Sequence, residues 1–259
     1  MQVLLTIGIA AYAITTLWYL LDLFRPNGQE SPLPVRFYML ASGYWLIAFP
    51  YGAYSYALCT GIRPWLIASA WSLGVIYLYL ARRYEIRALG SSVAALSAIL
   101  STFALLVSTT ETSLFTGPLA DWVLWIHIAL AFIGVTAFSL AAAVSTIYLS
   151  VSGRLKRKKV IPKTLPPLET LDRLALRAVS IGFAFYTVAL LLGTAQAVRQ
   201  GTGEVKLAYV FAAISWVIYG VVLQARMTAG WRGRKAAFLT IIGLISALVV
   251  VGLYAVGLT

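Results

Sequence analysis

The chain has 259 residues, of which 61% are hydrophobic and 11% are charged, and its formal net charge is +12. A water-soluble domain of this length could not hide so much apolar surface, so the composition excludes a soluble globular protein and predicts a membrane protein. The basic residues lie in short loops beside apolar runs, where they orient a membrane protein, and we therefore exclude nucleic acid as a partner. The single cysteine, Cys59, excludes an internal disulfide and a cysteine-cluster metal site.

Eight apolar runs are candidates for membrane-spanning helices, which predicts an all-α polytopic bundle. The N-terminus has no basic segment and no clear cleavage site, so we expect the first run to be retained as a span. We expect one membrane domain over residues 1–259, with a four-helix part over 1–110 and a second over 121–259. The runs cover roughly Val3–Phe24, Phe37–Cys59, Pro64–Leu80, Ala88–Ser108, Trp122–Leu149, Leu176–Val198, Leu207–Leu223 and Ala236–Val256.

The loops between these runs differ in charge. Alternate loops are rich in lysine and arginine, and the others are poor in basic residues. The positive-inside rule then places both termini outside the membrane, and it places the start of the fifth run there too. The basic loops contain Arg82, Arg83, Arg87, Arg154, Lys156, Arg157, Lys158, Lys159, Lys163, Arg226, Arg232, Arg234 and Lys235.

The only histidine, His127, lies where the fifth apolar run begins, in DWVLWIHIALAF. A histidine in a membrane helix is costly unless it has a partner, and its ring is well suited to ligate heme iron or carry protons. Small residues share its helix face, which would let another helix or a flat cofactor approach closely. Ligand binding and ordinary helix packing therefore both remain open for His127. The small residues are Ala131, Gly134, Ala141, Ala142 and Ser145.

No other motif indicates catalysis. The chain lacks the common phosphate-binding glycine loops, the HExxH pattern and paired carboxylates within a span, so we expect it not to be an enzyme. The nearly uncharged spans argue against an ion-coupled carrier. Gln196 and Gln224 lie within predicted spans, where amides usually form hydrogen bonds to a neighbouring helix.

A six-coordinate heme needs a second axial ligand besides a histidine. Cys59 ends the second run on the same predicted side as His127, and a buried cysteine is otherwise a small apolar residue. Arg199, Lys206 and Arg63 are also predicted on the outer side, where they would either pair with heme propionates or anchor helices at the interface.

Several stretches of the C-terminal half occur in a recognisable order. They read WIHIALAFIGVTAFSLA with His127, LPPLETLDRLALRAVSIGF from Leu165, GTAQA from Gly193, WVIYGVVLQAR from Trp216 and GWRGRKAAFLTIIG from Gly230. In these stretches the chain resembles the cytochrome c assembly membrane-protein family, which includes the CcsA, ResC, CcmC and HemX-type proteins. The first four runs match more loosely, through WSLGVIYLYLARRYEIRALG from Trp71, and look most like the HemX-type branch.

This resemblance implies heme as a cofactor, because CcsA-like and CcmC-like proteins present heme from a tryptophan-rich outer segment flanked by histidines. His127 matches the outer histidine before that segment. The chain reads VRQGTGEVKLAYVFAAIS in the segment's place, without tryptophan or aspartate, and it has Gln224 where the family often has a histidine.

We therefore predict a HemX/CcsA-like protein of the inner (plasma) membrane with an accessory role in heme handling or cytochrome c biogenesis. His127, Cys59, Arg199 and Lys206 are its candidate heme contacts, with His127 on the metal. Its predicted partners are membrane lipid and other membrane proteins of cytochrome assembly or a respiratory complex. The alternative is a non-catalytic subunit or scaffold that keeps the fold without heme.

Overall fold

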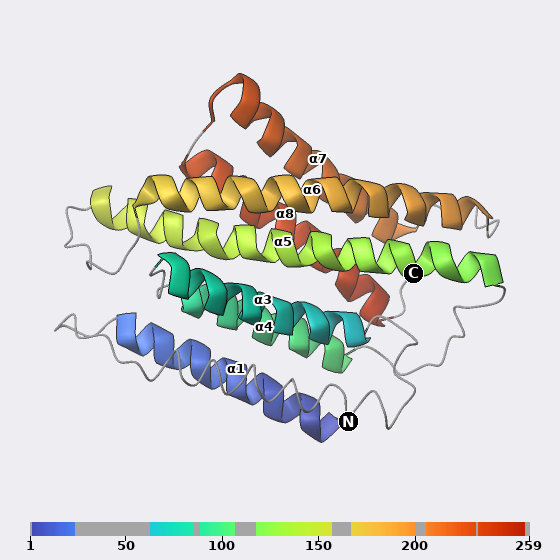
Figure 1. Cartoon of the computed structure of the whole chain (residues 1–259), viewed down its shortest axis with the longest axis horizontal. Helices are drawn as coiled ribbons and strands as arrows, with labels where there is room; N and C mark the ends of the chain where they lie inside the picture. The colour runs from blue at the N-terminus through green and yellow to red at the C-terminus, as the bar shows by residue number, and fades with distance from the viewer. Residues whose placement is uncertain are drawn as a thin grey trace.

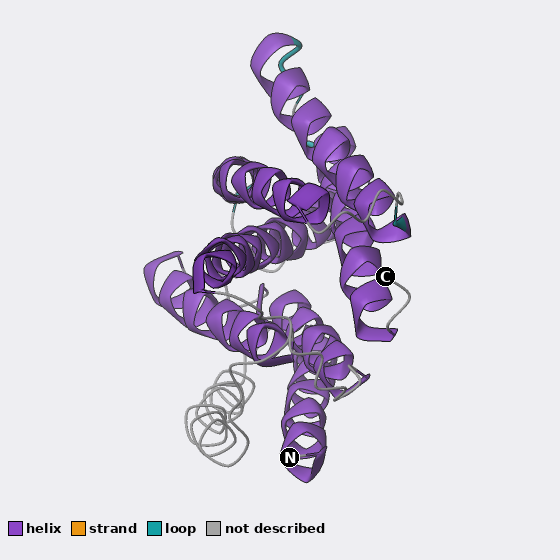
Figure 2. Ribbon diagram, turned by 90° about the vertical axis from the view of Figure 1, so that its right-hand side faces the viewer, coloured by secondary structure: helices purple, strands orange, loops and turns teal. Residues whose placement is uncertain are grey.

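The computed structural model describes residues 2–23, 63–84, 89–106, 118–156, 167–199, 206–231 and 233–256. Every regular element in these ranges is an α-helix (Figure 2), so the all-α prediction is confirmed. The second predicted span, 37–59, lies outside the described residues. The helices are α1 (Gln2–Leu23), α3 (Arg63–Tyr84), α4 (Leu89–Leu106), α5 (Pro118–Lys156), α6 (Leu168–Arg199), α7 (Leu207–Thr228) and α8 (Arg234–Val256).

Among the described residues, five helices, α4 to α8, are long and apolar enough to cross a membrane, which is fewer than the eight predicted spans. The 66–81 portion of α3 is a shorter apolar stretch. The described helices coincide closely with the predicted runs. Two of them are longer: α5 continues beyond the end of its run, and α6 begins before the start of its run. The chain is therefore a multi-pass helical membrane protein.

The extension of α6 has a local cause in the sequence LETLDRL. Leu171 is buried while Glu169 and Arg173 are exposed, so this first part of the helix is amphipathic and needs no bilayer around it. The carbonyl oxygen of Pro167 accepts hydrogen bonds from the backbone N–H groups of Thr170 (3.0 Å) and Leu171 (3.2 Å), which starts the helix. Glu169 lies in the first turn, where a carboxylate interacts favourably with the helix dipole.

The helices lie roughly along the long axis of the molecule (Figure 1). α5 is central: it packs against α6 and α8 on one side and against α3 and α4 on the other. α1 packs on α4, and α7 packs mainly on α8. We call the end where α1 begins and α8 finishes the terminal end, and the end where α5 finishes and α6 begins the basic end.

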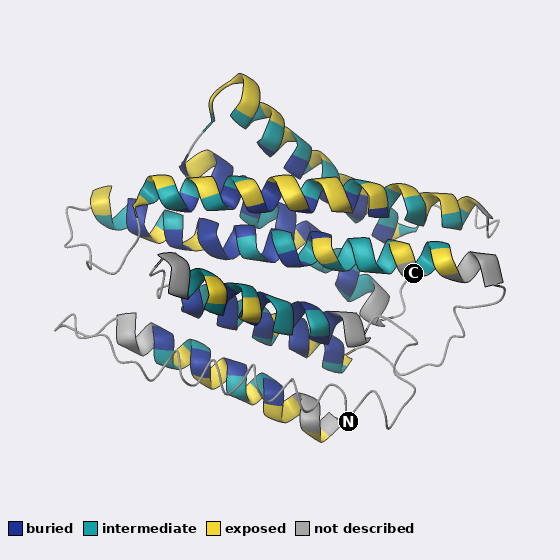
Figure 3. Ribbon diagram, in the orientation of Figure 1, coloured by how far each residue is buried: buried dark blue, intermediate teal, exposed yellow. Residues whose placement is uncertain are grey.

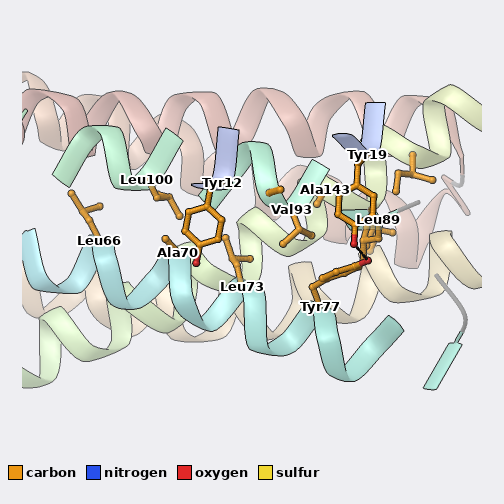
Figure 4. Packing of buried hydrophobic residues seen from close by; sticks show 14 of the residues in the cluster. Tyr12, Tyr19, Leu66, Ala70, Leu73, Tyr77, Leu89, Val93, Leu100 and Ala143 are labelled. Atoms are coloured by element: carbon orange, nitrogen blue, oxygen red, sulfur yellow. Dashed lines mark hydrogen bonds between the residues drawn. The ribbon is translucent and has the colours of Figure 1, made fainter. Parts of the chain in front are cut away.

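Two clusters of buried side chains fill the bundle, and the burial pattern changes along each helix (Figure 3). The first joins α1, α3, α4 and part of α5, with a few residues of α6 and α8, and it contains a hydrogen bond of 2.8 Å between the hydroxyls of Tyr19 and Tyr77 (Figure 4). The second joins α5 to α8 around Phe138, whose ring stacks on Tyr219 and meets the edge of Tyr186. α5 contributes to both clusters and therefore connects them.

A polar junction ties α6, α7 and α8 together at the basic end. The side chain of Arg226 is only 4% exposed and lies 3.2 Å from the carboxylate of Asp172. Arg226 also donates a hydrogen bond to the backbone carbonyl of Asp172 (3.3 Å), and the Asp172 carboxylate accepts one from the N–H of Gly233 (3.3 Å). This buried ion pair fixes the depth of α6 relative to the turn between α7 and α8.

Candidate functional site

The line of contact between α5 and α6, which we call the α5–α6 seam, runs along glycine residues. A Cβ atom at Gly134 would lie 3.2 Å from the Cβ of Tyr186, and one at Gly182 would lie 2.7 Å from the ring of Phe138. At the terminal end of the seam, a Cβ at Gly193 would lie 2.8 Å from Cε1 of His127. The missing side chains let the two backbones approach closely, and this close approach places His127 directly against α6.

His127 is held by a hydrogen bond across the seam. Its Nδ1 lies 2.7 Å from the backbone carbonyl oxygen of Ala189 on α6, and the ring is half-buried. A carbonyl oxygen can only accept, so Nδ1 carries the proton and donates it. The neutral ring then has its lone pair on Nε2, which makes no hydrogen bond within the described residues. Metal-binding histidines commonly donate their other nitrogen to a carbonyl in the same way.

The small residues on the His127 face make close helix contacts. Gly134 lies against Tyr186, and Ala141 and Ala142 are buried in the cluster around Phe138. This part of the face is therefore filled by protein side chains, which confirms helix packing there and leaves no room for a flat cofactor. Among the described residues, these side-chain contacts do not extend to the terminal end of the face, where His127 lies.

Gln196 lies on the same side of α6 as Gly193, one turn closer to the terminal end. Three residues of helix correspond to a rise of about 4.5 Å. The Oε1 atom of Gln196 is buried and has no hydrogen-bond partner among the described residues, so the hydrogen bond expected to a neighbouring helix is not seen there. Gln224 is exposed on α7 and also departs from the expectation of an amide buried between helices.

The other predicted site residues are placed less fully. Cys59 lies outside the described residues, and Arg199 is the last residue of α6, with a side chain that is not described. Lys206 directly precedes α7; it is half-buried, and its side chain makes no capping hydrogen bond. In the described ranges, no group of three or more His, Cys, Asp or Glu residues could hold a metal ion. The roles of Cys59, Arg199 and Lys206 as heme contacts stay predictions.

Sequence reasoning missed three parts of this site: the carbonyl of Ala189, the close approach at Gly193 and the unpaired amide of Gln196. The last two belong to the GTAQA stretch, whose small residues beside an amide were the available signal. The described residues fit a heme held through a single protein nitrogen, because Nδ1 of His127 is anchored and Nε2 is uncommitted.

Comparison with known proteins places this geometry in a family. The model of the cytochrome C assembly protein family matches residues 62–258. The chain belongs to this family. The matched region includes all of α3 to α8, and hence His127, the α5–α6 seam and the polar junction at the basic end.

The chain is similar to several proteins named cytochrome c biogenesis protein CcsA. It is 25% identical to the one from Chlamydomonas reinhardtii over 189 residues, which cover 69% of this chain and 52% of that protein. It is 34% identical to the one from Prochlorococcus marinus over 96 residues (35% of this chain, 29% of that protein). It is 35% identical to the one from Gloeobacter violaceus over 81 residues (30% of this chain, 24% of that protein).

The chain thus spans about half the length of the Chlamydomonas relative and less of the others. No solved structure matches it.

Proposed function

We propose that this family member has an accessory role in heme handling or cytochrome c biogenesis, and that His127 contacts heme at the terminal end of the bundle. The observation that carries the proposal is the hydrogen bond from Nδ1 of His127 to the Ala189 carbonyl, because Nε2 is then a potential ligand atom with no partner among the described residues. Heme supplies a redox-active iron with open axial positions. The role of this chain's own residues is to hold and orient the group, and we propose no catalytic step.

We place the protein in the inner (plasma) membrane with its terminal end on the outer face. The support is the cluster of cations at the basic end, where Arg154 and Lys156 close α5 and Arg226 lies in the last turn of α7. The heme would then be handled at the outer surface. Lys206, before α7, and Arg199, at the end of α6, are proposed to pair with its propionates, and Cys59 is proposed as a second axial ligand.

A heme titration of the detergent-purified protein tests the proposal. We expect a Soret band from bound heme in the unaltered protein, and loss of that band or a clear shift in its wavelength in His127→Ala. Ile126→Ala is the matched control, because Ile126 is the exposed neighbour on the same helix turn. Absence of a Soret band after heme addition, or an unchanged band in His127→Ala, contradicts the heme contact.

A second candidate function is a heme-free subunit or scaffold of a respiratory or assembly complex. It is favoured by a continuous apolar face on α6, where Ile181, Phe185, Val188 and Leu191 are exposed at helical spacing. Such a face suits lipid and also a partner helix. Stable co-purification with such a complex, without stoichiometric heme, supports this role; purification as a heme-loaded protein without partners contradicts it.

A further inference from the structure

We infer that Gln196 is a second contact for the ligand bound at His127, and that its amide hydrogen-bonds a carboxylate of that ligand. The inference rests on the proposed heme contact and extends it to a residue outside the predicted set. It concerns the terminal end of the α5–α6 seam, where His127 lies against Gly193 and Gln196 follows Gly193 by about one turn of α6.

The first step is the state of the amide. The Oε1 atom of Gln196 is buried and has no partner among the described residues. A buried polar atom without a hydrogen bond is unfavourable, and most such atoms in folded proteins have a partner. Gln196 lies in the last turn of α6, close to the exposed Val198, so its side chain could also point outward, and we take the inward amide as a sign of a group that it binds.

The second step is the chemistry of that group. A primary amide has a carbonyl oxygen and an NH₂ group of similar shape, and a half rotation exchanges them, so the buried end can act as acceptor or donor. Apart from its iron, heme is an apolar ring with two propionates, which are acceptors when ionised. The NH₂ group of Gln196 would therefore face inward and donate to a propionate. A hydrogen bond to a charged group in a weakly solvated site is among the stronger ones.

The third step is the contrast with the predicted cations. Lys206 is half-buried at the start of α7, and a cation attracts a carboxylate over a distance without fixing its orientation. An amide acts only at contact distance, so Gln196 would set the rotation of the ring about the axis through His127. Gln196 is thus a positioning contact, and its effect is strongest when the ligand has a free carboxylate.

The test compares two ligands and three proteins. Heme and its dimethyl ester, in which both carboxylates are blocked, are titrated into the detergent-purified wild-type protein, Gln196→Leu and Gln224→Leu. Gln224→Leu is the matched control, because it is the same substitution at an exposed site on α7. We expect Gln196→Leu to raise the Kd for heme about tenfold, as for a hydrogen bond to a charged partner. We expect a clearly smaller rise in its Kd for the dimethyl ester, whose uncharged ester carbonyls accept only a weaker hydrogen bond, and no change for either ligand in Gln224→Leu.

The outcomes separate this inference from the proposed function. If the Soret band depends on His127 but Gln196→Leu binds heme like the wild type, the inference is wrong and the heme contact stands. The same holds if Gln196→Leu weakens heme and its dimethyl ester equally, because the amide then acts through general packing. If wild-type protein binds no heme, or if binding is independent of His127, both the inference and the proposed function are wrong.

Discussion

Replacing Gly193 by alanine gives the most direct structural test of the α5–α6 seam. The added Cβ would lie 2.8 Å from Cε1 of His127, whereas ordinary van der Waals contact begins at 3.4 Å. Two responses relieve this overlap. The His127 ring can turn away and lose its 2.7 Å hydrogen bond to Ala189, or the helices can separate and lose packing around Gly134.

Either response lowers the stability of the folded protein, and this loss is partly offset by the higher helix propensity of alanine. Overpacking a tight contact costs about 1–3 kcal/mol, and a lost hydrogen bond costs about 1 kcal/mol. Alanine in place of a helical glycine gains about 1 kcal/mol in helix propensity. Gly153, on the partner helix α5, has no atom within 4 Å of its would-be Cβ, so Gly153→Ala keeps the gain without the overlap. We therefore expect Gly193→Ala to be about 2 kcal/mol less stable than Gly153→Ala.

The assay is reversible unfolding in mixed detergent micelles, followed by circular dichroism, with wild-type protein beside both variants. Gly153→Ala should unfold at a higher denaturant concentration than wild type, and Gly193→Ala at a lower one. Heme affinity should fall in Gly193→Ala alone, because only there is His127 displaced. Equal stabilisation by the two substitutions would refute the close approach at Gly193, and with it the position of the ring.

Three further predictions concern the basic end and the sidedness of the bundle. Asp172→Ala leaves Arg226 buried without its counter-charge and should destabilise the protein by about 3 kcal/mol in the same assay, whereas exchanging both residues for apolar ones of similar size should restore most of that loss. Gly233→Ala should be more destabilising than Gly230→Ala. Both glycines have positive φ (79° and 61°), but only at Gly233 would the new Cβ meet another side chain within 4 Å, the Tyr148 hydroxyl at 2.6 Å. Equal losses of stability in the two variants would contradict that contact. A cysteine at Lys206, in a background without the native cysteine, should react with a membrane-impermeant maleimide from the outer side of intact cells, and labelling only after lysis would reverse the proposed orientation.

Much of the fold follows from hydropathy alone. The long apolar runs predicted the spans because a bilayer requires uninterrupted apolar helices, and α7 and α8 coincide with their predicted runs to within a few residues at one end. α6 begins at Leu168, before its predicted membrane run at Leu176, because its first turns are amphipathic and a hydropathy threshold does not include them. Glu169 lies in the first turn of α6, where an acidic residue is typical of a helix N-terminus.

Only part of the site can be predicted from the sequence. His127 is conspicuous because it is the single histidine of an apolar chain. It also lies within the region that the family model matches. Its partner is a backbone carbonyl at Ala189, and a backbone atom has no sequence signature. The pairing of Asp172 with Arg226 likewise depends on the relative depths of α6 and α7, which composition does not determine.

The measurement that tests the heme contact most directly is the Soret spectrum of His127→Ala with and without added imidazole. If Nε2 of His127 binds the iron, the variant should lose the wild-type spectrum, and imidazole, which supplies the same nitrogen donor, should restore it. The imidazole concentration needed should rise further in a protein that also carries Gly193→Ala, because the added methyl group narrows the space left by the ring. A wild-type spectrum in His127→Ala without imidazole would contradict the contact, and so would a spectrum that imidazole does not restore.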